Sequence, residues 1–241
     1  MWSEQQNRRA GPAPVEPGRA GEKWDDFPTL RRENPFPFVC AGCGDCCRGR
    51  RDLVLSGYDL WRIARWVRLA PRITAAAFCK RTVGPQSGLP TLVLTPDPST
   101  GNCRFLEGGA CAIHPARPLA CALYPLGQRI DPVTAAVSYY AQTPLCGAAA
   151  EARTLAEYLR DAGVADREGS DARWAVVCTQ LSARLKAAAG HPHLKTALYR
   201  AERALYYDYT TREEFYPQFR QNTEELWPLL DRILTEPDSI L

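Results

Sequence analysis

The sequence predicts an α+β fold in which a small cysteine-rich domain of short strands and helices precedes a mainly helical C-terminal region. Nine of the ten cysteines, and most of the prolines and glycines, lie between residues 36 and 150. From residue 151 to residue 241, apolar residues recur at the spacing of amphipathic helices. Residues 1–35 are rich in Pro, Gly, Arg and Glu without such a pattern, so we expect a disordered or extended N-terminal arm.

The composition is that of an ordinary globular protein. Of 241 residues, 45% are hydrophobic, which is enough to bury a core, and the net charge of +3 does not require a nucleic-acid partner. Charged residues interrupt every apolar run before it reaches the roughly 20 residues of a membrane helix. The N-terminal residues lack the apolar segment of a secretion signal. We therefore expect a cytoplasmic protein with reduced thiols, in which clustered cysteines are metal ligands or redox groups.

Two helices and two strands are predicted within the cysteine-rich domain. Ser56 and Asp59 form a capping-box signature, which predicts a helix directly behind them. A second, shorter helix is expected at about 74–81. The runs 89–95 and 133–141 are rich in β-branched or aromatic residues, and we expect them to form a small sheet beside the cysteine loops.

The C-terminal region is predicted to contain four helices, at about 151–162, 171–188, 194–205 and 212–234. Pro217 and Pro228 fall inside the last of these, and because proline lacks a backbone donor we expect kinks or breaks there. Five aromatic residues of this region either pack in the core or form a surface for a protein partner: Tyr206, Tyr207, Tyr209, Phe215 and Tyr216.

The candidate site begins with four cysteines within eight residues, Cys40, Cys43, Cys46 and Cys47. A Cys-x-x-Cys turn places two sulfurs on one metal ion, and glycines between the cysteines permit such a turn. Three cysteines at two-residue gaps also match the run that binds a four-iron, four-sulfur cluster. The spacing therefore suits a zinc ion and an iron-sulfur cluster equally. Because three cysteines at two-residue gaps plus a remote fourth suit the cluster, we expect an iron-sulfur cluster to be at least one native form.

The adjacent pair Cys46 and Cys47 is expected to diverge, because neighbouring side chains point in different directions, so Cys47 would reach a second centre or a second iron of a polynuclear one. Four distal cysteines supply further ligands: Cys103, Cys111, Cys121 and Cys146. Eight thiolates are enough for one polynuclear centre or two metal centres. A closed four-thiolate site leaves no open position for a substrate, which favours a structural or electron-transfer role.

Several residues near the thiols have less specific interpretations. Five arginines are close in sequence to a cysteine and are either solvated or hydrogen-bonded to sulfur: Arg48, Arg50, Arg51, Arg104 and Arg117. His114 is interpreted as a surface or packing residue, with a ligand role as the alternative. Cys79 and Cys178 are expected to be small buried hydrophobic residues rather than ligands.

These motifs together resemble the CxxCxxCC, or YkgJ-type, cysteine-cluster family of zinc- or iron-chelating proteins. The resemblance covers about residues 38–147 and rests on Cys40-Ala-Gly-Cys-Gly-Asp-Cys-Cys-Arg48, Cys103-Arg-Phe-Leu106, the segment 111–121, Tyr124-Pro125 and Cys146-Gly147. It departs at His114, where the family often has tyrosine. The resemblance implies metal binding by the eight cysteines in a mostly bacterial, intracellular protein.

Three functions follow as expectations. The first is a metal-binding protein holding zinc or iron, with no reaction assigned. The second is a protein-modifying or redox enzyme, because one branch of the family includes flagellin lysine N-methylase; against this, the chain has no glycine-rich strand-turn-helix motif for S-adenosylmethionine. The third is a structural zinc protein whose C-terminal helices bind a protein partner.

Overall fold

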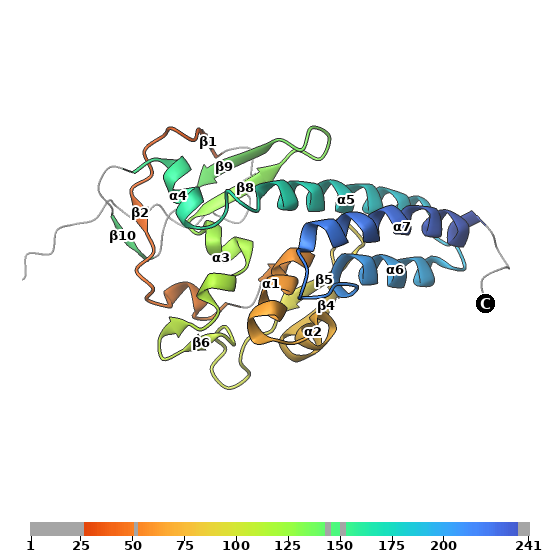
Figure 1. Ribbon diagram of the computed structural model, residues 1–241, viewed down its shortest axis with the longest axis horizontal. Helices are drawn as coiled ribbons and strands as arrows, with labels where there is room; N and C mark the ends of the chain where they lie inside the picture. The colour runs from red at the N-terminus through yellow and green to blue at the C-terminus, as the bar shows by residue number, and fades with distance from the viewer. Residues whose placement is uncertain (1–26, 51–52, 143–145, 150–152, 236–241) are drawn as a thin grey trace, which may run out of the picture.

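The computed structural model of the protein describes residues 27–50, 53–142, 146–149 and 153–235 (Figure 1). It is a mixture of helices and short antiparallel strands, as the sequence predicts, and the C-terminal region is helical. Within these residues, no helix combines the length and apolar character needed to cross a bilayer. Of the predicted N-terminal arm, residues 1–26 lie outside the described part, whereas Thr29–Leu30 forms strand β1.

The first sheet has the order β1-β9-β8, in which β9 spans Val137–Ala141 and β8 spans Leu126–Ile130. A separate two-stranded ladder pairs β2, Phe38–Val39, with β10, Ala148–Ala149. Two short helices complete this part of the molecule: α3 at Leu119–Leu123 and α4 at Leu155–Asp161. Their apolar side chains share a core with Phe36, Phe38 and Tyr139. The β2-β10 pairing holds the two ends of the cysteine-rich segment together.

The second sheet has the order β3-β5-β4, formed by Val54–Leu55, Pro90–Leu94 and Cys79–Val83. The prediction that runs 89–95 and 133–141 share one sheet is therefore wrong, because β5 and β9 lie in different sheets. Sequence pattern identifies strands but not their partners, since strand pairing depends on long-range contacts.

Helix α1, Gly57–Val67, begins with the predicted capping box: the Ser56 hydroxyl accepts from the Asp59 amide, and the Asp59 carboxylate accepts from the Ser56 amide. Helix α2 differs from its prediction and spans Pro71–Phe78, after which the chain enters β4. Proline at the first helical position needs no amide partner and has a helical φ, so Pro71 starts α2.

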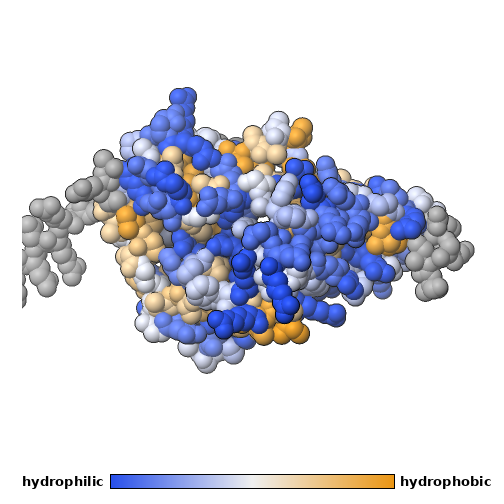
Figure 2. Space-filling model, in the orientation of Figure 1, coloured by the Kyte–Doolittle hydropathy of each residue, from blue (hydrophilic) through white to orange (hydrophobic). Residues whose placement is uncertain are grey.

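Three long helices lie side by side in the C-terminal region (Figure 1): α5 at Glu168–Ala187, α6 at Leu194–Glu202 and α7 at Phe215–Thr235. A short π-helical segment, Arg203–Tyr207, follows α6. The face that α5 and α7 present in Figure 2 is largely hydrophilic. Their opposite sides pack with α1 and β5 in the largest core of the described residues.

The last helix is broken at neither proline, because α7 begins at Phe215, which puts Pro217 in its first turn, and continues through Pro228. Pro228 is exposed, so the backbone carbonyl that loses its helical partner can be hydrated, while Leu226 and Leu230 on either side are buried. Three of the five aromatic residues that the sequence offers for a core or a partner surface are core residues. Tyr206, Tyr209 and Phe215 are all less than 8% exposed and belong to the same core.

A buried ion network joins this helical region to the cysteine-rich part. Arg167, 2% exposed, donates from Nη2 to the Asp59 carboxylate at 2.7 Å and from Nε to Asp171 at 2.7 Å. The same Asp59 oxygen accepts the Leu119 amide at 2.9 Å. Asp59 therefore fixes the start of α3, the helix that carries Cys121, against α1 and α5.

Candidate metal centre

All eight predicted ligand cysteines line one cavity of about 60 Å³. They arrive on separate parts of the chain: the 40–47 loop, the segment and hairpin that carry Cys103 and Cys111, helix α3 with Cys121, and Cys146 just before β10. No disulfide joins any of them, since all are free thiols. The sequence prediction that distant cysteines meet the loop is thus matched by their placement.

The 40–47 loop ends in a 3-10 helix, η2, at Asp45–Cys47, and Gly44 precedes it with a φ of 71°. A Cβ atom at Gly44 would collide with the Gly109 carbonyl oxygen and would lie 2.7 Å from Leu106 Cδ1. Gly109 belongs to the tight turn between β6, Leu106–Glu107, and β7, Ala110–Cys111. Glycine at position 44 therefore allows the loop to pack directly on the hairpin.

Backbone hydrogen bonds tie the two segments together. The Cys103 amide donates to the Cys47 carbonyl at 2.8 Å, and the Gly49 amide donates to Asn102 Oδ1 at 3.0 Å. Pairing of Leu106 with Cys111 then brings Cys111 back towards Cys103. These contacts place the side chains of Cys47, Cys103 and Cys111 beside one another, and none of the contacts involves a sulfur atom.

Cys47 is the centre of a compact thiol group, with hydrogen-bonding contacts to Cys46, Cys103 and Cys111. These contacts raise the pKa of Cys47, so its thiol keeps the proton and donates it. Contact with Cys47 in turn lowers the pKa of Cys46 to about 6, and the pKa of Cys103 and of Cys111 to about 7. The three outer sulfurs thus have thiolate character near neutral pH, which metal binding requires.

The predicted divergence of Cys46 and Cys47 is not observed, because their thiols are in contact. Adjacent residues on a 3-10 helix start about 120° apart, but both side chains can turn into the same cavity. The wall that receives them is apolar and includes Leu53, Leu94 and Ile113. Cys46 and Cys47 consequently lie in one group of thiols.

A second group lies around Cys43 and Cys146, whose sulfurs and an Asp45 carboxylate oxygen all lie within 4.8 Å of one another. Burial, followed by the contact with Cys43, raises the pKa of Cys146 to about 11. The backbone amide of Cys146 donates to the Tyr124 hydroxyl at 3.3 Å, which fixes its position. Sequence reasoning missed Asp45, although it stands inside the motif between Cys43 and Cys46.

The remaining two predicted ligands flank these groups. Cys121 packs with Cys103 and Cys111 against the core formed around Phe105 and Ile113. Burial raises the pKa of Cys121 to about 12, with Arg50 acting in the opposite direction. Cys40 is exposed on its outer side and lines the cavity near Tyr158.

Two arginines predicted as neighbours of sulfur lie at the thiols. Arg50 lowers the pKa of both Cys46 and Cys103 by its positive charge, and Arg117 lines the cavity. Two others are engaged elsewhere: Arg48 pairs with Asp45 at 3.2 Å, and Arg104 donates to the Ala77 carbonyl at 3.1 Å. Arg51 lies outside the described residues.

His114 also lines the cavity, with Nδ1 3.1 Å from Arg117 Nη1. Because a guanidinium group can only donate, Nδ1 accepts this bond and the neutral ring carries its proton on Nε2. Burial and the positive charge of Arg117 lower the pKa of His114. His114 is thus held neutral beside the thiols, a condition under which imidazole can bind a metal.

The two cysteines excluded from the predicted site do not line the cavity. Cys79 and Cys178 both pack against the C-terminal core, and burial raises the pKa of each to about 12. They are packing residues, as the sequence predicts, with Cys178 on α5 and Cys79 at the start of β4.

The donor set fits zinc or iron. Thiolates are soft ligands that select these metals, whereas calcium and magnesium require oxygen ligands. Two ligand atoms at about 2.3 Å from a tetrahedral ion are about 3.8 Å apart, so donors within 4.8 Å need little movement to share one ion. Cys43, Cys146 and Asp45 therefore have the spacing of ligands to one ion, and the other cavity thiols have the chemistry of metal ligands.

Comparison with known proteins agrees with this reading of the site. Residues 39–147 match the model of the CxxCxxCC family, which is described as "Putative zinc- or iron-chelating domain". The matched segment includes all eight cavity cysteines. No curated protein and no solved structure matches the chain.

Proposed function

Because residues 39–147 match the model of the CxxCxxCC family, we propose that the protein binds zinc or iron through its eight cavity cysteines. The observation that carries this proposal is the convergence of eight thiols from distant segments on one small cavity. Unpaired thiols gain little by lying together, since each could pack separately as a small hydrophobic group. Their shared position is explained when they share metal ions.

The contacts support two neighbouring sets of ligands. One set comprises Cys46, Cys47, Cys103 and Cys111, and the other includes Cys43 and Cys146 with Asp45 nearby. Cys121 lies beside Cys103 and Cys111 of the first set, whereas Cys40 and His114 line the same cavity and can complete the second. Two ions a short distance apart, or one polynuclear iron-sulfur centre, use the same thiols.

A role in structure or electron transfer fits this site better than Lewis-acid catalysis. Four thiolates around a divalent ion fill its tetrahedral coordination and leave no position for a substrate. They also leave a net negative charge of about −2, which nearby cations stabilise. Arg50 and Arg117 supply that positive charge at the cavity.

Purification without oxygen, followed by metal analysis and visible absorption, tests the proposal. We expect at least one zinc or iron ion per chain. A broad visible absorption band together with acid-labile sulfide identifies an iron-sulfur centre, whereas a colourless protein with bound zinc identifies thiolate-zinc sites. A folded protein that retains neither metal, and binds neither when they are added under reducing conditions, contradicts the proposal.

A further inference from the structure

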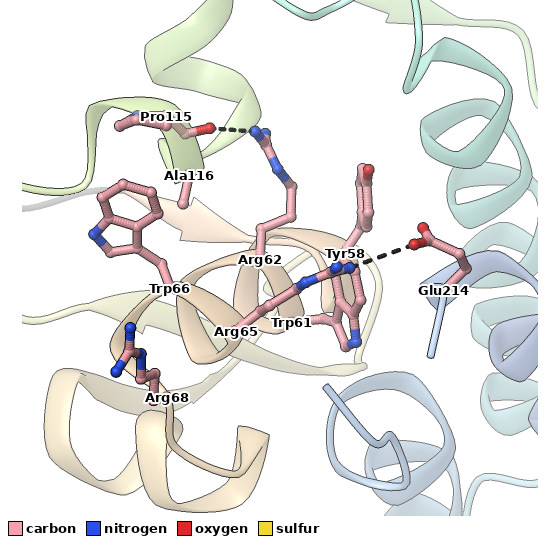
Figure 3. Close-up of a pocket in the computed structure, with 9 residues that line it drawn as sticks. All are labelled: Tyr58, Trp61, Arg62, Arg65, Trp66, Arg68, Pro115, Ala116 and Glu214. Carbon is pink, nitrogen blue, oxygen red and sulfur yellow. Dashed lines mark hydrogen bonds and ion pairs between the residues drawn. The ribbon is translucent and has the colours of Figure 1, made fainter. Parts of the chain in front are cut away.

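A second, larger pocket of about 630 Å³ lies outside the thiol cavity, between helix α1 and the 114–116 turn (Figure 3). Its walls come mainly from one face of α1, with contributions from the turn and from the residue that precedes α7: Tyr58, Trp61, Arg62, Arg65, Trp66, Arg68, Pro115, Ala116 and Glu214. This volume is typical of a pocket for a small molecule.

Positive charge dominates the pocket, which has three arginines and one acidic residue, Glu214. Arg65 makes only a long ion pair with Glu214, at 3.4 Å, and its guanidinium group lies 5.1 Å from the centre of the Trp61 ring. One long contact leaves most of its five N–H donors available. The side chain of Arg68 has no hydrogen-bond or ion-pair partner among the residues that the structure describes.

The third arginine forms the back of the pocket. Arg62 donates to the Pro115 carbonyl at 2.6 Å and to the Arg117 carbonyl at 3.3 Å, so its guanidinium group is held in place. Burial and the positive charges of Arg167 and Arg117 lower the pKa of Arg62. An anion in the pocket would offset this accumulated positive charge.

Trp66 provides a flat apolar surface beside these cations. Its side chain is 49% exposed, although an indole ring is usually buried when no ligand covers it. Figure 3 shows Trp66 and Arg62 both extending from α1 towards the 114–116 turn, while Arg65 points to Glu214 on the other side. A planar ring and a multiply charged group can therefore be bound by neighbouring parts of one pocket.

We propose that this pocket binds a nucleotide, with its base stacked on Trp66 and its phosphates bound by Arg65 and Arg68. Guanidinium groups bind phosphate oxygens with paired hydrogen bonds, and aromatic rings stack on nucleobases with about 1–3 kcal/mol per base. Arg65 lies in the last turn of α1 and Arg68 is the residue that ends this helix, so both cationic side chains start from the same end of the pocket wall. This proposal goes beyond metal binding and does not depend on it.

The pocket adjoins the thiol cavity through a single 3-10 turn. Pro115 and Ala116 face the pocket, whereas His114 and Arg117, on either side of them, line the cavity. The turn lies between two proposed metal ligands, Cys111 and Cys121. A bound nucleotide would thus sit one turn of chain away from the metal centre.

Isothermal titration of the anaerobically purified protein tests the proposal with three probes: ATP, adenosine and inorganic tripolyphosphate. ATP is expected to bind at least tenfold more tightly than either part alone, because only ATP uses both the ring and the cations. Replacing Arg68 by alanine should weaken ATP binding at least fivefold, and Trp66→Ala should have an effect of similar size. The matched control is Arg72→Ala, an exposed arginine of α2 outside the pocket, which should leave binding unchanged.

Replacing Glu214, the single acidic residue of the pocket, should change the affinity for ATP in the opposite direction. Glu214→Gln should strengthen ATP binding a few-fold, because it removes a like charge and releases Arg65, whereas Glu213→Gln, outside the pocket, should not. No heat with ATP at millimolar concentration would overturn the proposal. So would equal losses in Arg68→Ala and Arg72→Ala, tripolyphosphate binding as tightly as ATP, or a single-stranded oligonucleotide binding more tightly than ATP.

Discussion

The backbone amide of Cys103 donates a hydrogen bond to the carbonyl oxygen of Cys47 at 2.8 Å. This bond joins the 40–47 loop to the second cysteine segment through main-chain atoms alone. The thiol groups of both residues are consequently left to face the cavity, where they are in contact. The protein positions at least part of its ligand set by folding, so a metal ion meets thiols that are already close together.

Packing of the loop on the hairpin should depend on the glycine at position 44. Gly44→Ala places a Cβ against the Gly109 carbonyl at a φ of 71°, so the loop must move away from β6 and β7. We expect this variant to lose most of its bound metal, as measured by metal analysis after gel filtration. Gly49→Ala is the matched control, because its φ of 63° causes similar strain but no atom lies within 4 Å of the added Cβ. Equal metal content in the two variants would show that the close approach is unimportant.

If the thiols form two separate ligand sets, removing one cysteine should cause only partial loss of the bound metal. Cys146→Ala removes a thiol from the set around Cys43, whereas the set around Cys47 keeps all four of its thiols. The variant should therefore retain about half of the wild-type metal when two ions are bound. Complete loss in Cys146→Ala would instead show that the eight thiols hold one polynuclear centre.

The buried network around Arg167 should contribute strongly to stability. Asp59→Ala removes one partner of a buried guanidinium group and leaves the Leu119 amide without its acceptor. Breaking one side of a buried ion pair costs about 3–5 kcal/mol, whereas an exposed pair contributes about 0–1 kcal/mol. Urea unfolding at neutral pH should show this difference between Asp59→Ala and Glu224→Gln, whose 3.9 Å pair with Arg220 is exposed. A loss below about 1 kcal/mol for Asp59→Ala would refute the assigned role.

Alkaline stability should depend on the buried thiol of Cys178. Burial raises its pKa from 9.0 to about 12, so the folded protein holds the proton more tightly than the unfolded chain does. The resulting stabilisation is fully present below about pH 9 and decreases as the pH rises towards about 12. Between about pH 9 and pH 11, the free energy of unfolding should therefore fall less in Cys178→Ala than in wild type. Thr179→Ala, an exposed change on the same helix, should follow the wild-type curve, and identical curves for all three proteins would contradict the prediction.

Local features of this fold could be predicted from the sequence because their causes are local. The capping box at Ser56 and Asp59 determines the start of α1 through hydrogen bonds within four residues. The amphipathic pattern of the C-terminal region predicts helices that the structure confirms, with ends shifted by a few residues. Pro228 is an exception, since long-range burial of Leu226 and Leu230 keeps α7 intact.

Features that depend on distant segments could not be predicted in the same way. The pairing of β9 with β8 and β1, rather than with β5, follows from packing around Phe36 and Tyr139. Contact between Cys46 and Cys47 depends on a cavity wall that other segments build. The sequence does predict which cysteines take part, because the spacing of thiols is itself a chemical constraint, but not how they are grouped.

The central claim is that the thiols around Cys47 bind metal, and metal content in matched variants tests it most directly. Wild-type protein and Cys178→Ala, purified without oxygen, should contain the same amount of zinc or iron, because Cys178 packs in the C-terminal core away from the cavity. Cys47→Ala should lose at least half of that metal while its far-ultraviolet circular dichroism still shows a helical protein. Equal metal content in Cys47→Ala and Cys178→Ala, or a folded wild-type protein without metal, would contradict the account.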